Sequence, residues 1–327
     1  MTKLTKTIAA FLLLAVNAHA ADVVLGKSSD LTWSAAGANR VAVFGPSDYL
    51  YTVGAGVVQI TLYIGAGGDI TVPSTILSLP VTTYAAYAFT NKLIKSVVLQ
   101  DNATALSSYM FLGNTGITNV VINPGLRTAN FRCFQNCGNL DVPILPTNCN
   151  YIGYQMFAGT KTRTIAIGSG VTTLESDGAY LAAECGSLGS AVIQPATGVK
   201  KISNNMLQNC IVLTNLVIDV SAFTNTPSLG QSFYGCAKIT NTVESLFTRT
   251  NGFPALTTSA SAFEGCKLLS GNGMRFIDMV LAGRVHASYR VGSNATDSTS
   301  SSYRTFYGCT SLVDWVSITN LYPNFSQ

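Results

Sequence analysis

The chain has 327 residues, of which 47% are hydrophobic and only 10% are charged, so it can bury a core and is not a disordered protein. Its formal net charge is +4 and it has no dense stripe of Lys and Arg, which argues against nucleic acid as a partner. Gly, Ser, Thr and Asn are abundant, a balance typical of extracellular β-rich solenoids and fibres.

Residues 1–20 have the pattern of a bacterial signal peptide. Two lysines precede an apolar run from Ile8 to Val16, and Ala18-His19-Ala20 has the small-x-small form that signal peptidase accepts. The apolar run is too short to span a bilayer, and no later window offers about 20 uninterrupted apolar residues. The sequence therefore predicts a mature chain that starts near Ala21, is secreted or held at the cell surface, and has no transmembrane segment after signal cleavage.

Residues 21–68 are predicted to form an N-terminal β-rich cap. They contain the apolar run Val41–Phe44, and Gln59–Ile64 alternates as a strand does. A repeat stack needs such a cap, because its end rung would otherwise present an unpaired edge and an open apolar face.

A recurring segment of the form Phe-x-Gly/Asn-Cys-x-x-Leu/Ile begins at Phe134, Phe233, Phe263 and Phe306. Weaker copies are anchored at residues 89, 111, 157, 182 and 207, which makes about nine copies. Successive anchors lie 22 to 26 residues apart, except for the last two intervals of 30 and 43, which contain insertions. This spacing is the period of a solenoid coil.

Each position of the repeat has a physical interpretation. The anchor aromatic supplies a large apolar side chain for the interior, and Gly or Asn two residues later suits a positive φ at a sharp turn. Short β-rich runs follow the turn and are predicted to be strands, at 120–122, 165–167, 191–193 and 216–218. We therefore predict a β-rich solenoid of about nine coils over 69–320 with a parallel strand ladder, followed by a C-terminal tail at 321–327.

The segment Ile70–Ile76 followed by Tyr87-Ala88-Phe89, and the segment Met110-Phe111 through Val121-Ile122-Asn123-Pro124, resemble BspA-type leucine-rich repeats. The resemblance covers residues 69–320. It implies a leucine-rich-repeat-like solenoid in a surface or secreted protein that adheres to host proteins, other cells or glycans. Two stretches depart from the pattern, since the coil at Ala182 lacks the aromatic anchor and 270–303 is not a regular coil.

The eight cysteines follow the repeat. Six of them lie three residues after an anchor, and Cys133 and Cys149 align with apolar positions of other coils, so we favour buried thiols. Disulfides between stacked thiols stay an alternative in an exported protein, and a metal site is a remote one. The predicted structural core contains Phe89, Phe111, Phe134, Phe157, Leu207, Phe233, Phe263, Phe306, Cys137, Cys185, Cys210, Cys236, Cys266 and Cys309.

Two groups of polar residues are weak candidates for a binding site. Glu175, Asp177 and Glu184 could serve glycoside chemistry or bind a cation such as calcium, although a solvated edge of an irregular repeat is the favoured interpretation. The insertion at 270–302 is equally compatible with a binding loop and a plain surface loop. It carries Arg275, Arg284, His286 and Arg290.

No catalytic motif stands out, because the mature chain has a single histidine and lacks a nucleophile elbow and a P-loop. The leading hypothesis is a non-catalytic protein that binds an extracellular protein or glycan through its solenoid surface and needs no cofactor or metal. Self-assembly into a surface layer or fibre is the alternative. A carbohydrate-active enzyme is a third and weaker hypothesis.

Overall fold

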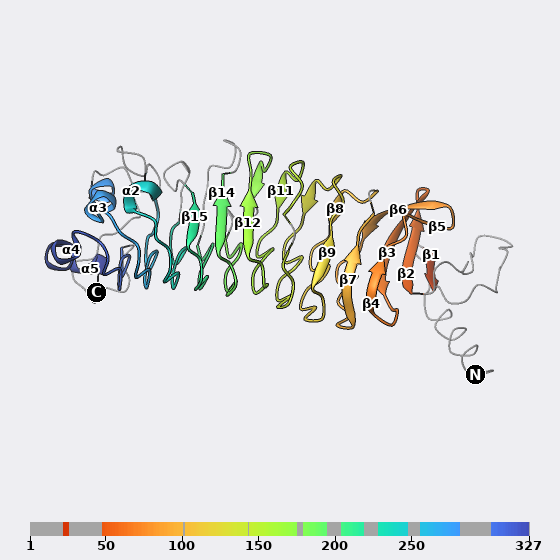
Figure 1. The fold of residues 1–327 in the computed structure, drawn as a ribbon. Helices are drawn as coiled ribbons and strands as arrows, with labels where there is room; N and C mark the ends of the chain where they lie inside the picture. The colour runs from red at the N-terminus through yellow and green to blue at the C-terminus, as the bar shows by residue number, and fades with distance from the viewer. Residues whose placement is uncertain are drawn as a thin grey trace.

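The structure is a computed structural model, and it describes residues 22–25, 48–100, 102–142, 144–174, 179–194, 204–218, 228–247, 256–281 and 302–326. The chain winds into an elongated stack of coils, with a small sheet at the N-terminal end and short helices at the C-terminal end (Figure 1). This is the predicted β-rich solenoid with leucine-rich-repeat-like coils.

A five-stranded sheet closes the N-terminal end of the stack. Ala55 and Gly56 form the two-residue turn of its central hairpin with φ values of 51° and 79°, the positive pair that such turns require. Its third strand pairs in parallel with the first coil and so starts the stack. In spatial order the strands are β1 (Asp22–Leu25), β2 (Tyr49–Gly54), β3 (Val57–Tyr63), β6 (Leu79–Tyr84) and β5 (Thr75–Ile76).

Two three-stranded parallel sheets form one side of the stack, and side chains alternate between core and solvent along their strands. The coil between the two sheets carries Pro146, which lacks the backbone N–H that a ladder needs. The first sheet contains β4 (Gly68–Thr71), β7 (Ile94–Val98) and β9 (Asn119–Val121), and the second contains β12 (Thr164–Ile167), β14 (Ser190–Ile193) and β15 (Asn215–Val217).

A second side of the stack is a parallel sheet of four two-residue strands, each of which buries its second residue. The strands are β8 (Ala105–Leu106), β10 (Thr128–Ala129), β11 (Tyr151–Ile152) and β13 (Thr173–Leu174).

The single nine-rung strand ladder that we predicted is therefore wrong in its extent. Among the described residues beyond β15, the strand side continues as isolated parallel bridges, from Thr242 to Ser270 and from Gly271 to Leu312. Helices then take the place of strands in each coil. They are α2 (Val243–Leu246), α3 (Met274–Leu281), α4 (Trp315–Leu321) and α5 (Pro323–Ser326).

The element common to all coils is the turn around the anchor, and its backbone forms what we call the turn ladder. In every predicted copy, the anchor N–H donates to a carbonyl of the next coil, as Phe111 does to Cys133 at 2.9 Å and Phe306 does to Phe325 at 2.6 Å. Continuity along the molecule thus comes from this ladder more than from the strands.

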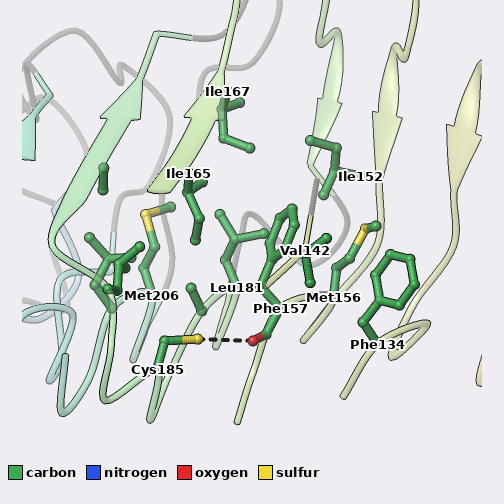
Figure 2. Close-up of a cluster of buried hydrophobic side chains, with 14 of the residues drawn as sticks. Phe134, Val142, Ile152, Met156, Phe157, Ile165, Ile167, Leu181, Cys185 and Met206 are labelled. Atoms are coloured by element: carbon green, nitrogen blue, oxygen red, sulfur yellow. Dashed lines mark hydrogen bonds between the residues drawn. The ribbon is translucent and has the colours of Figure 1, made fainter. Parts of the chain in front are cut away.

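The core lies inside the coils, and all fourteen residues predicted for it are buried. Figure 2 shows one part of the core, which includes the predicted residues Phe134, Phe157 and Cys185. The anchor rings stack along the axis, with Phe111 and Phe134 centroids 5.1 Å apart. The six cysteines that follow an anchor by three residues donate their thiol to the anchor carbonyl of the preceding coil, as Cys185 does to Phe157 at 2.9 Å. Each thiol thus satisfies a buried carbonyl as well as filling space.

The C-terminal segments are more integrated than we predicted. Helix α3 falls inside the predicted insertion at 270–302, yet it buries Phe276, Ile277 and Val280. The predicted tail at 321–327 contains α5, whose Phe325 is fully buried. The carbonyl of Phe325 accepts the hydrogen bond from the N–H of the last anchor, Phe306. The start of the insertion and the end of the chain are therefore parts of the core.

Candidate binding surface

The turn ladder holds the residue two positions before each anchor in the left-handed region. All nine such residues have φ between 51° and 64°, and none is glycine. For seven of the nine, the N–H donates to a carbonyl of the next coil, as when Tyr109 donates to Phe131 at 3.1 Å, so the ladder needs this conformation. In chain order they are Tyr87, Tyr109, Arg132, Gln155, Tyr180, Asn205, Gln231, Ser261 and Arg304.

A left-handed backbone disfavours bulky side chains, because Cβ then approaches the following carbonyl oxygen at a cost of roughly 1–2 kcal/mol per residue. Tyrosine at Tyr87, Tyr109 and Tyr180 is therefore a poor choice for the turn itself. Strained positions of this kind are found where the side chain has a separate use. The tyrosines thus mark this face of the solenoid as a candidate interaction surface.

These tyrosines belong to a row of aromatic side chains that crosses five consecutive coils, which we call the aromatic ridge. The rings of Tyr87 and Tyr109 stack with centroids 5.1 Å apart, and Tyr109 meets Phe131 edge-on at 4.7 Å. Tyr154 and Tyr180 meet edge-on at 6.0 Å. Tyr87 is 47% exposed and the other four rings are partly exposed, so the ridge combines mutual support with access to solvent.

Arg132 lies within the ridge. Its guanidinium carbon is 6.0 Å from the ring centroid of Tyr109 and 5.4 Å from that of Tyr154, and its Nε donates to Gln155 Oε1 at 2.7 Å. A cation beside aromatic faces is stabilised by the ring quadrupoles. The described part of the ridge therefore combines partly exposed aromatic rings with one fixed cation.

The sequence model of the BspA type leucine rich repeat region matches residues 69–181 and 178–272, which together cover more than half of the chain. The chain belongs to the BspA-type leucine-rich repeat family. The family pattern is matched in six copies, so about six coils follow it closely and the predicted number of nine is too high for regular coils.

The chain is similar to solved structures of bacterial leucine-rich repeat proteins. The leucine-rich repeat protein TpLRR of T. pallidum is 22% identical with a TM-score of 0.50, and the match covers 59% of this chain and 88% of that one. A leucine-rich repeat protein of Bacteroides ovatus is 18% identical with a TM-score of 0.47, over 81% of this chain and 74% of that one. No curated protein matches the chain.

Within this BspA-type solenoid, two of the seven predicted binding candidates fall in the described residues. Glu184 is exposed with φ 63° and takes the turn position two residues after its anchor, where other coils have Gly or Asn. Arg275 belongs to α3, and its Nε donates to the carbonyl of Phe247 at the end of α2. These two residues have local structural roles on different elements. Glu175, Asp177, Arg284, His286 and Arg290 lie outside the described residues.

All eight cysteines are free and buried, so the disulfide alternative is not realised in this structure. Burial raises the pKa of the Cys137 thiol to about 12 and that of Cys149 to about 11. A thiol that stays protonated is a poor nucleophile and a poor metal ligand. Within the described part of the chain, no group of three or more His, Cys, Asp and Glu residues could hold a metal ion.

No helix in the described ranges is long and apolar enough to cross a membrane. The family match and the solenoid fold account for the repeat, but they assign no ligand to it.

The repeat pattern did not predict the aromatic ridge, because the pattern begins at the anchor and includes only the residues after it. The available signal was an offset, since Tyr87, Tyr109 and Tyr180 each stand two residues before their anchors at 89, 111 and 182. Phe131 and Tyr154 stand three residues before theirs. Aligning the residues before the anchors would have placed all five aromatics in neighbouring columns.

Proposed function

We propose that this protein is exported and binds an extracellular protein or glycan through the surface of its solenoid, without catalysing a reaction. The aromatic ridge carries the proposal. Aromatic residues dominate the energy of recognition surfaces because they bring large area at a small cost in side-chain entropy. Here Tyr87, Tyr109 and Phe131 contact one another in sequence across three coils, and Tyr154 and Tyr180 form a second contact across the next two.

Repetition supports this role. Successive coils lie about 4.8 Å apart, so the ridge presents equivalent groups at regular steps and weak contacts can add along the axis. The ridge side chains pack on a ladder whose backbone N–H groups donate to the next coil, which fixes their positions. A pre-organised surface loses little entropy when it binds.

Binding is tested with the chain from Ala21 onward on an array of extracellular-matrix proteins and glycans. We expect a saturable partner whose affinity falls at least tenfold in the double variant Tyr87→Ala/Tyr109→Ala. Tyr307→Ala is the matched control, since Tyr307 has a similar exposure of 44% but lies at the C-terminal end of the stack. A partner lost equally in both variants would contradict a role for the ridge.

Particle size is measured in the same buffer to test the self-assembly alternative. A monomer at high concentration together with a saturable partner supports the proposal. Large ordered assemblies without any array partner would overturn it in favour of a structural role.

A further inference from the structure

Arg132 and Arg304 occupy the same position in their coils, two residues before the anchor, and both approach tyrosine rings. They differ in one respect. Arg304 forms an ion pair with Glu264 at 2.9 Å, and Arg163 elsewhere forms one with Asp141 at 2.6 Å. Arg132 has no carboxylate partner among the residues that the structure describes.

The Arg132 guanidinium is nevertheless held in place. Tyr109 and Tyr154 flank it from the coils on either side, and Gln155 accepts its Nε proton at 2.7 Å. The side chain is partly exposed. Because the Nε–H is used by Gln155, the two terminal nitrogens of the guanidinium keep N–H donors that lie in one plane. Two such parallel donors are the arrangement that binds a carboxylate through two hydrogen bonds. The positive charge is thus oriented and still without an anion.

The surroundings of this cation favour a sugar polymer over a peptide. A peptide that binds as an added strand needs an unpaired backbone edge, but here the N–H groups of Tyr109 and Arg132 donate to Phe131 and Tyr154 of the next coil at 3.1 and 2.7 Å. The site presents the partly exposed rings of Tyr109 and Tyr154, the Gln155 amide and a single charge. Such a row suits an extended glycan, because sugar C–H groups pack on the electron-rich faces of aromatic rings and sugar hydroxyls form hydrogen bonds with an amide.

We propose that Arg132 is an anion subsite of the aromatic ridge that binds the carboxylate of an acidic glycan, such as one containing uronic acid. This inference rests on the proposed function, because it assigns a ligand class to the same surface. One cation in the described part of the ridge matches a polymer with widely spaced carboxylates. Densely sulfated chains would require a cluster of Lys and Arg.

The test is binding of the chain from Ala21 onward to hyaluronan oligosaccharides, which carry a carboxylate on every second sugar. We expect Arg132→Gln to weaken binding about tenfold or more, as loss of a charged hydrogen bond does. Arg132→Lys should lower the affinity several-fold, because lysine keeps the positive charge but lacks the planar fork of N–H donors. Arg304→Gln is the matched control and should bind like the wild type, since its cation is already paired with Glu264.

Three competitors define the ligand class. Carboxyl-reduced hyaluronan should fail to compete. Poly-glutamate and heparin should compete more weakly than unmodified hyaluronan at the same concentration of anionic groups. Equal binding by Arg132→Gln and the wild type, or stronger competition by poly-glutamate, would overturn the inference. If the array of matrix proteins and glycans yields a partner that depends on Tyr87 and Tyr109 but not on Arg132, the proposed function stands and this inference alone fails.

Melting temperatures of the Arg132 variants are measured alongside. A variant that melts like the wild type and binds more weakly supports a ligand contact. The inference is overturned if both Arg132 variants and Arg304→Gln lose binding to the same extent and each of them also melts at a lower temperature. Arg132 would then have a structural role.

Discussion

At the scale of single residues, every predicted copy of the repeat except the first has two left-handed positions, one on each side of the anchor. The position after the anchor mostly has the residues that this conformation favours, such as Gly113, Asn136 and Gly235. The position before it has tyrosine, arginine and glutamine, which adopt this conformation at a cost. The residue type after the anchor is therefore set by the turn itself. The residue type before the anchor is set by the side chain that the turn exposes on the surface.

Any side chain at Gly235 should destabilise the fold. Its φ is +72°, and a Cβ built there would lie 2.5 Å from Oδ1 of Asn209 in the preceding coil. We expect Gly235→Ala to lower the free energy of unfolding by about 1–2 kcal/mol or more, measured by urea denaturation. Gly186→Ala is the control, because nothing lies within 4 Å of its Cβ position, and it should change stability by less than about 0.5 kcal/mol.

The sequence predicted the left-handed turn after the anchor because Gly and Asn are recognisable there. Two coils show its limits, since Glu184 adopts the turn without either residue, and Asn91 is not left-handed and binds the Gly65 carbonyl instead. The left-handed position before the anchor was not predictable from residue type, because tyrosine and arginine have no preference for it. It follows from the direction of the N–H groups in the stacked coils, which one sequence does not reveal.

At the scale of elements, the stack is held together by rings, thiols and backbone ladders that run along its axis. A strand here has as few as two residues and would have no stability alone, so each coil depends on its neighbours. The sequence predicted the strands β9, β12, β14 and β15 to within a residue, but neither the two-residue strands of the second side nor the helices α2 to α4 that take the place of strands. The replacement follows a change of sequence between coils, where Val243 to Leu246 and Met274 to Leu281 have apolar residues at helical spacing.

Truncation of an anchor in the middle of the stack tests this dependence. Phe134 is fully buried and stacks on Phe111, so Phe134→Ala should cost about 3–5 kcal/mol in the free energy of unfolding. Phe131→Ala in the same coil is the control. Its ring is partly exposed on the aromatic ridge, and its loss should cost less than Phe134→Ala by at least about 2 kcal/mol. A cost below about 1 kcal/mol for Phe134→Ala would contradict the assigned core.

At the scale of the whole molecule, the core is unusual in carrying so many ionisable groups that are neutral. All eight cysteines are buried, and burial raises the pKa of seven of them, namely Cys133, Cys137, Cys149, Cys185, Cys210, Cys266 and Cys309. For Cys210, the hydrogen bond with Cys236 is the largest cause and burial adds to it. A core of this kind is stable only while its thiols keep their protons.

Stability should therefore fall in alkali. The unfolded thiols lose their protons near pH 9, whereas Cys149 and Cys137 hold theirs in the folded state up to pKa values of about 11 and 12. Because the folded pKa values are raised, the stabilisation is complete below pH 9 and is lost as the pH rises toward 11 and 12, by up to about 1.4 kcal/mol per pH unit for each thiol. Urea denaturation under reducing conditions from pH 7.5 to 10.5 measures this slope.

Cys137→Ala should make the fall of the unfolding free energy with pH less steep by the contribution of one thiol. Its stability at pH 7.5 should also be lower, because the Phe111 carbonyl loses the thiol donor at 3.0 Å. The two effects are separable, because the lost hydrogen bond shifts the whole curve while the lost thiol changes its steepness. A stability that stays flat from pH 8 to pH 10.5 would mean that the thiols are ionised or exposed in the folded chain. It would then contradict the stacked, protonated thiol core.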